Sequence, residues 1–186
     1  MAAVAVRLLR NWGAVSYTHL KASDDAIKEL IEHYKNYDEK TMIVFFGDHQ
    51  PPLSNEFYEA LYGKQLDART TKEVFQQYAV PFFIWANYDI QEQENVITSL
   101  NYLGVLALQA GNFPLTAFQT YLKDLSEKVP VINTIGFIEA DGSITSVGAE
   151  ETFPEEIQKA IKNYRYFAYN NLLDQRHRLP NFFSLK

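Results

Sequence analysis

The sequence predicts an α/β fold, and three observations support this class. Two short and almost wholly apolar runs, 42–46 and 80–86, are bounded by turn residues, as buried strands are. Segments with apolar residues at helical spacing alternate with these runs, which is typical of α/β proteins. The chain has 186 residues, of which 47% are apolar and 22% charged, so it is long enough to bury a core.

The first half of the chain is predicted to contain three helices and two strands. Ser23 opens a helix whose first turn carries Asp24 and Asp25, where acidic side chains favour the helix dipole. The strand 41–46 is apolar from Met42 to Phe46, which predicts burial on both faces, as in a parallel sheet covered by helices. Helix-capping residues predict one helix that starts at Ser54 and another over 70–78. The second apolar run predicts a strand over 80–86.

The second half is predicted to contain further helices and one hairpin. A helix over 95–110 stops at Gly111, and Asn112 with Pro114 opens the next helix. A strand over 131–139 turns back at 144–147 as a hairpin. A capping-box pattern of Thr152 and Glu155 opens a long helix through Leu173, and the tail from Arg176 is irregular. No segment rich in Gly, Ser or Pro predicts a division of the chain.

The first twenty residues differ in character from the rest of the chain. Residues 15–20, VSYTHL, can be encoded by a transposon-end adapter used in preparing sequencing libraries. We therefore interpret residues 1–20 as a non-native scar and residues 21–186 as the genuine protein. The alternative is an ordinary N-terminal strand that ends at His19. On either interpretation His19 is not proposed as a ligand.

Composition excludes several classes of function. The net charge is −6 and no basic run is present, so the chain has no electrostatic footprint for nucleic acid. The absence of cysteine excludes disulfide scaffolds, cysteine metal sites and a cysteine nucleophile. No stretch reaches the roughly 18–20 apolar residues that a transmembrane helix needs, so no such segment is expected in this chain.

Asp48 and His49 are the strongest candidates for chemistry. They directly follow the strand 41–46, and ligands in α/β sheets gather beyond the carboxyl ends of strands. A carboxylate and an imidazole are both good ligands for a divalent metal ion. Gly47 allows a tight backbone path that lets both side chains face one ion, and Pro51 with Pro52 keeps the pair at a strand–loop junction. Two ligands are too few for a tight catalytic site.

Structural alternatives stand beside each candidate residue. Asp48 can instead bond nearby backbone amides, and His49 can be a satisfied imidazole at a strand end. His33 is interpreted as a solvated surface histidine, and Gln50 is near enough to the pair to reach a substrate. Trp85 and Asn87 are expected to lie near the motif and are predicted to act mainly as a core residue and a cap. The cluster of Arg176, His177 and Arg178 could bind a phosphate but is interpreted as a solvated tail.

From residue 21 to about residue 183, the chain resembles the C-terminal part of lipoteichoic acid synthase-like proteins. The resemblance rests on five segments in order: KASDDAIKELIEHYKNYDEKTMIVFFGDHQPP, YAVPFFIWANYD, SLNYLG, VPVINTIGF and YRYFAYNNLLD. These proteins are membrane-anchored phosphoglycerol transferases of the sulfatase/alkaline-phosphatase superfamily. The resemblance implies a partial alkaline-phosphatase/sulfatase-like sheet flanked by helices.

The resemblance also implies a function for the motif. In that family the matching Asp and His bind the catalytic metal, usually Mn²⁺ or Mg²⁺, which places Asp48 and His49 at the metal. The family's Thr nucleophile, a further acidic ligand and the substrate histidines lie upstream and have no counterpart here. The chain is therefore expected to be the C-terminal portion of a catalytic domain, without a catalytic nucleophile and inactive alone.

The implied parent enzyme transfers phosphoglycerol from a phosphatidylglycerol-like lipid to a cell-envelope glycopolymer. It would sit in a bacterial cell membrane with its catalytic domain outside, and the missing N-terminal part of that domain would be this chain's partner. The alternatives are a phosphoethanolamine transferase, a sulfatase or phosphodiesterase of the same superfamily, or a non-catalytic remnant. The identity of the upstream nucleophile would discriminate among the enzymes.

Overall fold

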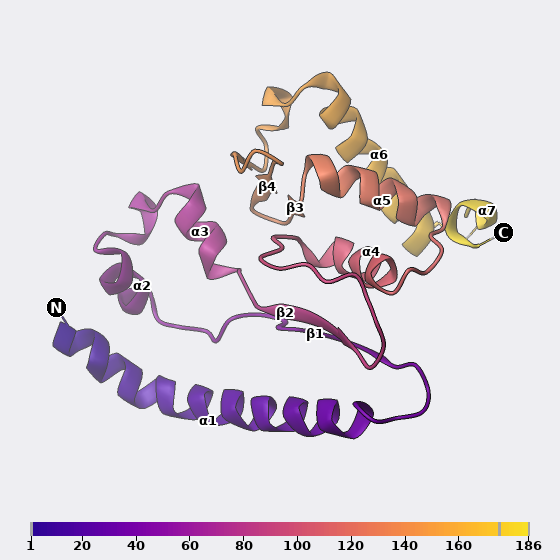
Figure 1. Cartoon of the computed structure of the whole chain (residues 1–186). Coiled ribbons are helices and arrows are strands. Elements are labelled where there is room, and N and C mark those ends of the chain that lie inside the picture. The colour runs from indigo at the N-terminus through magenta and orange to yellow at the C-terminus, as the bar shows by residue number, and fades with distance from the viewer. Residues whose placement is uncertain (1, 175, 186) are drawn as a thin grey trace. The chain divides into compact units, whose positions relative to one another are not determined.

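The computed structural model describes residues 2–174 and 176–185, with side-chain surroundings described from Thr18 onward. The chain divides into two compact units, Met1–Tyr88 and Asp89–Lys186 (Figure 1). The sequence gives no sign of this division, since no Gly-, Ser- or Pro-rich segment separates the units. Among the described residues, no helix combines the length and apolarity that a membrane span requires.

Helix α1, Ala2–Tyr34, opens the first unit and runs without a break through the segment predicted to start a helix. The predicted start at Ser23 is therefore wrong, as is the alternative of an N-terminal strand ending at His19. Residues 23–25 lie inside the helix, where Asp25 forms an ion pair with Lys21, with 3.2 Å between Oδ2 and Nζ. Residues with capping propensity are tolerated there because their backbone amides are already bonded within the helix.

A two-stranded sheet comes next, in which β1 (Met42–Phe46) pairs with β2 (Phe82–Ala86). The strands are antiparallel, with Met42 opposite Ala86 and Phe46 opposite Phe82, so the predicted parallel pairing is wrong. The predicted burial of β1 on both faces is also wrong, because Val44 and Phe46 are 36% and 42% exposed. A sheet of two strands within the described residues leaves these apolar side chains partly uncovered.

Asn87 fixes the end of this sheet at which β1 begins and β2 ends. Its side-chain oxygen accepts a hydrogen bond from the Thr41 backbone amide at 2.8 Å, just before β1 begins. Its side-chain nitrogen lies 3.1 Å from the carbonyl oxygens of Tyr34 and Tyr37, at the end of α1 and in the following turn. One side chain thus connects the end of α1, the start of β1 and the end of β2, which is the cap role expected for Asn87.

Two short helices lie between the strands, and their predicted caps are confirmed. The Ser54 hydroxyl accepts from the Phe57 amide at the start of α2, Asn55–Tyr62. The 3₁₀ helix η1, Leu66–Ala68, follows α2. A complete capping box, formed by Thr70 and Glu73, opens α3, Thr71–Gln77.

The second unit begins with two packed helices whose starts differ from those predicted. Helix α4, Leu100–Ala110, starts five residues late because Ser99 is extended and its hydroxyl accepts from the Ile132 amide. Gly111 ends α4, as predicted. Helix α5, Ala117–Lys128, is opened by a capping box of Thr116 and Gln119, which the sequence prediction missed.

The predicted strand 131–139 is two strands, β3 (Val131–Ile132) and β4 (Gly136–Ile138), because Asn133 interrupts it. The Asn133 side-chain oxygen accepts from two backbone amides, those of residues 135 and 136, and this turns the chain. The predicted hairpin is confirmed, since β4 pairs antiparallel with β5, Ile144–Ser146.

The remaining elements are η2 (Glu150–Thr152), α6 (Glu155–Leu172) and α7 (Pro180–Phe183). The predicted capping box of Thr152 and Glu155 is wrong, since the N-cap of α6 is Pro154 and the Thr152 hydroxyl donates to the Ala149 carbonyl. The tail is not wholly irregular, because it contains α7.

The main hydrophobic core lies in the second unit. Phe137 of β4 is 1% exposed and meets Phe153 edge-on, with 5.4 Å between ring centroids. The other members of this core come from α4, α5, α6 and the residue that follows α5: Tyr102, Val105, Leu122, Leu125, Val129 and Ile161. In the first unit, the buried apolar side chains among residues 18–88 are Tyr58 and Phe75.

We predict that Gly136→Ala destabilises the protein by roughly 1–3 kcal/mol, as overpacking of a filled site does. A β-carbon at this position would collide with the backbone carbonyl oxygen of Thr145 on the paired strand. Gly104→Ala is the matched control, because no atom outside its chain neighbours and the backbone of its own helix lies within 4 Å of its added β-carbon. In a helix interior that change stabilises by up to about 1 kcal/mol. Thermal and urea unfolding followed by circular dichroism would measure both, and equal effects would contradict this packing.

Candidate functional site

Gly47 is where the chain leaves strand β1. Its backbone amide donates to the Pro81 carbonyl at 3.0 Å, which extends the sheet by one bond. A β-carbon at Gly47 would lie 3.0 Å from Cβ of Val80, closer than side chains normally approach. Gly47 is not among the residues with positive φ, so it is needed for this close approach and not for an unusual turn.

Asp48 and His49 lie directly beyond this point and their side chains meet. Oδ2 of Asp48 is 3.4 Å from Nε2 of His49, and the other carboxylate oxygen, Oδ1, accepts from the His49 backbone amide at 2.8 Å. The two side chains are 82% and 72% exposed, respectively. The pair is therefore held together and open to solvent, although adjacent side chains of a regular strand point to opposite faces.

The tautomer of His49 is set by its neighbour. Nδ1 lies 2.9 Å from the backbone carbonyl oxygen of Gln50, which can only accept, so Nδ1 carries the hydrogen. In the neutral imidazole, Nε2 is then an acceptor that faces the acceptor Oδ2 of Asp48. A cation between these two atoms, either a proton on Nε2 or a metal ion, turns this contact from unfavourable to favourable.

The spacing of the pair fits a metal ion. Two ligand atoms that each lie ~2.1 Å from a tetrahedral ion are ~3.4 Å apart, and two adjacent ligands of an octahedral ion such as Mg²⁺ are ~3.0 Å apart. The Asp48 and His49 atoms are separated by 3.4 Å, which matches the tetrahedral spacing and is slightly wider than the octahedral one. The same atoms also suit a simple ion pair with a protonated imidazole. In addition, Asp48 accepts a hydrogen bond from a backbone amide, which agrees with the structural alternative to metal binding. Metal binding by Asp48 and His49 therefore stays a prediction.

Among residues 18–174 and 176–185, no group of three or more His, Asp or Glu side chains could hold a metal ion, so the pair has no third protein ligand within this part of the chain. The arrangement supplies one anionic oxygen and one nitrogen, and leaves other coordination positions to water, substrate or further protein. Such open coordination is usual where a metal acts on a bound substrate.

Gln50 has a structural role that the sequence did not reveal. Its side-chain nitrogen donates to the carbonyl oxygens of Gln76 and Ala79, at 3.1 Å and 2.6 Å. These carbonyls lie at the C-terminal end of α3 and just beyond it, where helix carbonyls lack partners within the helix. Gln50 thereby attaches the loop to α3, immediately after the Asp48–His49 pair.

Trp85 and Asn87 do not lie near the pair. Because β1 and β2 are antiparallel, the end of β2 is opposite the start of β1, and Asp48 follows the end of β1. The expectation that Trp85 and Asn87 face the same region as the motif is therefore wrong. It depended on a parallel pairing.

The other histidines are exposed, as predicted. His33 is on the surface of α1, beside the rings of Tyr34 and Tyr37. The side chain of His177 is 80% exposed and its Nδ1 lies 2.9 Å from Oδ1 of Asp174. Arg178 differs from the predicted solvated tail, since it is half-buried and bonded to Asn171.

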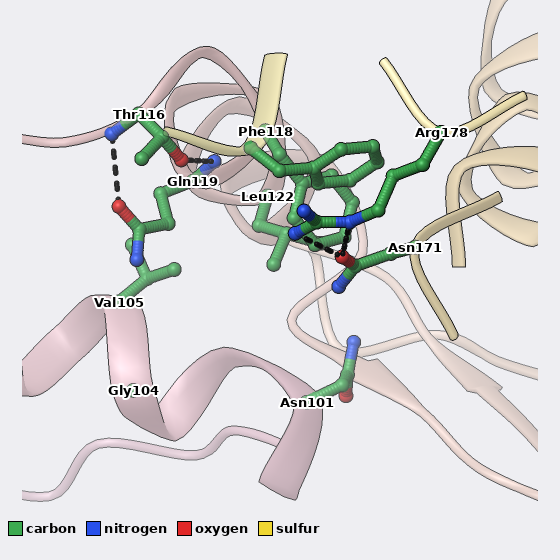
Figure 2. Close-up of a pocket in the computed structure, with 10 residues that line it drawn as sticks. Asn101, Gly104, Val105, Thr116, Phe118, Gln119, Leu122, Asn171 and Arg178 are labelled. Carbon is green, nitrogen blue, oxygen red and sulfur yellow. Dashed lines mark hydrogen bonds between the residues drawn. The ribbon is translucent and has the colours of Figure 1, made fainter. Parts of the chain in front are cut away.

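Arg178 lines a pocket in the second unit (Figure 2). The pocket has a volume of about 250 Å³ and is formed by α4, α5, α6 and the tail around α7. Its lining is a mixture of amides, apolar side chains and one cation: Asn101, Gly104, Val105, Thr116, Phe118, Gln119, Leu122, Asn171, Arg178 and Phe183. The sequence pattern singled out Arg178 but gave no sign that these segments meet.

Comparison with known proteins identifies a family model and a relative that match this chain. The family model described as Sulfatase matches residues 14–112, more than half of the chain. A candidate cyclic beta-1,2-glucan modification protein from Rhizobium meliloti is 22% identical over 168 residues, which are 89% of this chain and 26% of that protein. The chain thus spans about a quarter of the length of this relative.

A solved structure also shares the fold. It is the Streptococcus pyogenes phosphoglycerol transferase GacH, in complex with sn-glycerol-1-phosphate, at a TM-score of 0.60 and 15% identity. The similarity covers 88% of this chain and 36% of GacH. The likeness establishes the fold of this chain, which is mixed α/β and sulfatase/alkaline-phosphatase-like.

We predict that Glu73→Gln removes an acid-sensitive part of the stability that supports this site. Hydrogen bonds from the Thr70 amide, from Lys64 and from the Thr70 hydroxyl lower the pKa of Glu73 from 4.5 to about 2. A carboxylate with a lowered pKa stabilises the folded state above its unfolded pKa, and that stabilisation is lost as pH falls toward 2. The wild type should therefore lose stability more steeply than Glu73→Gln between pH 4.5 and 2.

Urea unfolding at several pH values would test this, with Glu29→Gln on the exposed surface of α1 as the matched change of charge. The wild type and Glu29→Gln should show the same acid dependence. Parallel pH profiles for the wild type and Glu73→Gln would contradict the assigned cause.

Proposed function

The chain belongs to the sulfatase family, and from this membership we propose that it is part of a metal-dependent phosphotransferase. The proposed reaction moves phosphoglycerol from a phosphatidylglycerol-like lipid to a cell-envelope glycopolymer. The observation that carries the proposal is the meeting of Asp48 and His49 beyond β1, at a spacing that suits one ion. The fold shared with a phosphoglycerol transferase supports the reaction class.

Each residue of the motif has a distinct proposed role. Asp48 supplies an anionic oxygen and His49 a neutral nitrogen, whose partner nitrogen is held by the Gln50 carbonyl. A carbonyl bonded to the second ring nitrogen fixes the orientation and tautomer of a ligating histidine. A Mn²⁺ or Mg²⁺ ion, when bound, would offset the charge that develops on the phosphoryl oxygens. We propose that the nucleophile is a threonine upstream of this chain, as the resemblance implies.

The remaining parts of the parent enzyme are also proposals. The chain spans about a quarter of the glucan modification protein and about a third of GacH, so both contain much more than this segment. We propose that the missing N-terminal part of the domain completes the metal site and supplies the nucleophile. The parent enzyme would lie in a bacterial cell membrane, with this domain outside the cell.

The acceptor has a second candidate. A relative is described as modifying cyclic beta-1,2-glucan, which favours a carbohydrate acceptor that is an oligosaccharide instead of a long polymer. The donor chemistry is the same in both cases. Phosphoethanolamine transfer, sulfatase or phosphodiesterase activity, and a non-catalytic remnant remain the alternatives. The upstream residue that attacks phosphorus or sulfur would distinguish the enzymes.

We predict that the isolated chain binds Mn²⁺ only weakly, and has no transferase activity. Asp48 and His49 supply two ligands, whereas catalytic metal sites generally use three or more from the protein. Isothermal titration should give an affinity weaker than about 1 μM, and Asp48→Ala and His49→Ala should remove the residual binding. His33→Ala, an exposed histidine away from the pair, is the control. Submicromolar affinity that depends on Asp48 and His49 would contradict the incomplete site.

In the complete parent enzyme, we predict that Asp48→Asn and His49→Gln each lower kcat by about 100-fold or more, since loss of one group that stabilises developing charge costs 10²–10³. Excess Mn²⁺ should partly restore activity, because these changes weaken binding of the ion. Release of diacylglycerol from phosphatidylglycerol would report the rate, with His33→Ala again as the control. Unchanged kcat in both variants would refute the metal-ligand assignment.

A further inference from the structure

We propose that the pocket of the second unit binds a small soluble molecule that carries a phosphate- or sulfate-type oxyanion. This proposal rests on residues of Asp89–Lys186 alone and does not depend on the proposed transferase function. The pocket volume is about 250 Å³. A molecule of liquid water occupies about 30 Å³, so the space suits a small solute rather than a drug-sized one.

The polarity of the pocket depends on which atoms of its amides are already bonded. Asn171 accepts from Nε and Nη2 of Arg178 at 3.2 Å and 3.0 Å, so the atom that faces the guanidinium is the amide oxygen. Gln119 accepts from the Thr116 backbone amide at 2.8 Å, which likewise identifies its oxygen. Both assignments are firm, since a guanidinium and a backbone N–H can only donate.

The nitrogens of these two amides remain available. Over residues 18–174 and 176–185, neither Nδ2 of Asn171 nor Nε2 of Gln119 donates a hydrogen bond to the protein. The Thr116 hydroxyl accepts from the Gln119 amide, so its hydrogen is also free to donate. The oxygens of these two lining amides are therefore occupied and their nitrogens are not. A pocket that offers donors selects a ligand rich in acceptors.

Arg178 adds positive charge to this set of donors. Among the described residues that line the pocket it is the one charged side chain, and none of them is acidic. Its guanidinium is positioned by Asn171 and lies over the ring of Phe183, 5.1 Å from the centroid. A guanidinium held in this way is well suited to a phosphate or sulfate group.

Asn101 provides a further donor at the floor of the pocket. Its side-chain nitrogen is buried and forms no hydrogen bond of normal length and angle among the described residues, although the Asn101 side chain interacts with the hydroxyls of Tyr102 and Tyr164. Its oxygen lies near the Ser99 hydroxyl. Figure 2 shows this nitrogen directed toward the side of the pocket where Asn171 and Arg178 lie. A ligand oxygen seated against the floor would give this buried donor a hydrogen bond of normal length and angle.

The variant Gln119→Glu tests the donor argument without disturbing the fold. Glutamate supports a capping box with threonine, as Thr70 and Glu73 do at the start of α3. The change therefore keeps the bond to Thr116 and replaces only the free nitrogen with a negatively charged oxygen. Gln93→Glu, at an exposed position outside the pocket, is the matched change of charge.

Arg178→Gln tests the cation, with Arg176→Gln as its control, because Arg176 is exposed and does not line the pocket. Inorganic phosphate and sulfate would be titrated at constant ionic strength against chloride, with binding followed by calorimetry. We expect saturable binding of phosphate and sulfate. The dissociation constants should rise at least tenfold in Gln119→Glu and Arg178→Gln, and change less than twofold in both controls. If phosphate and sulfate binding weakened equally in a variant and its control, the effect would be due to net charge alone, and the proposal would be overturned.

A spectroscopic readout keeps the test valid if Arg178→Gln fails to fold. In the unaltered chain, phosphate should shift the side-chain amide resonances of Asn101, Gln119 and Asn171 in a saturable way. Those of Asn87 and Gln50, whose nitrogens are already bonded to carbonyls, should stay in place. Absence of saturable shifts at Asn171 and Gln119, or equal shifts with chloride, would refute the site.

Discussion

The antiparallel pairing of β1 with β2 determines where the candidate site lies in the first unit. The last bond of the pairing runs from the Gly47 amide to the Pro81 carbonyl, and a β-carbon at Gly47 would meet Cβ of Val80 at a tight 3.0 Å. The chain must then leave the sheet, and the next two residues are Asp48 and His49. Their exposure and mutual contact result from this exit, since in a continuing strand they would face opposite sides.

A short sequence of contacts connects helix capping to the geometry of this pair. The capping box of Thr70 and Glu73 begins α3, and the carbonyls at and after the end of α3 receive the Gln50 side chain. The Gln50 backbone carbonyl in turn faces Nδ1 of His49 and fixes its tautomer. The capping residues of α3 contact neither Asp48 nor His49. They can still affect the imidazole of His49 in two hydrogen-bonded steps, first from α3 to the Gln50 side chain and then from the Gln50 carbonyl to Nδ1 of His49.

The sequence predicted some local features, such as the caps of α2 and α3, missed others, such as the start of α6, and predicted the long-range features poorly. Ser54 and the Thr70–Glu73 box were recognisable because capping depends on residues three apart in the chain. The direction of pairing between β1 and β2 was not, since a continuous apolar run predicts a buried strand and not its partner's direction. Asn133 breaks the predicted strand 131–139 through a local bond that competes with sheet pairing.

The same limit applies to the candidate sites. Asp48 and His49 were recognisable because they are adjacent and follow an apolar run. Arg178 was visible as part of a basic cluster, but the pocket that it lines joins α4, α5 and α6 with the tail, which no spacing in the sequence reveals. The role of Asn87 likewise depends on three segments that meet only in the folded unit.

The capping boxes that open α3 and α5 show how a structural bond can leave a chemical group available. In α3 the box is completed by Glu73, whose negative charge also favours the helix N-terminus. In α5 the same position is Gln119, which makes the same bond with its oxygen but gives up that favourable charge. What the glutamine gains is a free nitrogen donor, and this donor lies in the lining of the pocket that contains Arg178. The stability of α5 alone would favour glutamate at position 119, whereas the donor that the pocket gains explains glutamine there.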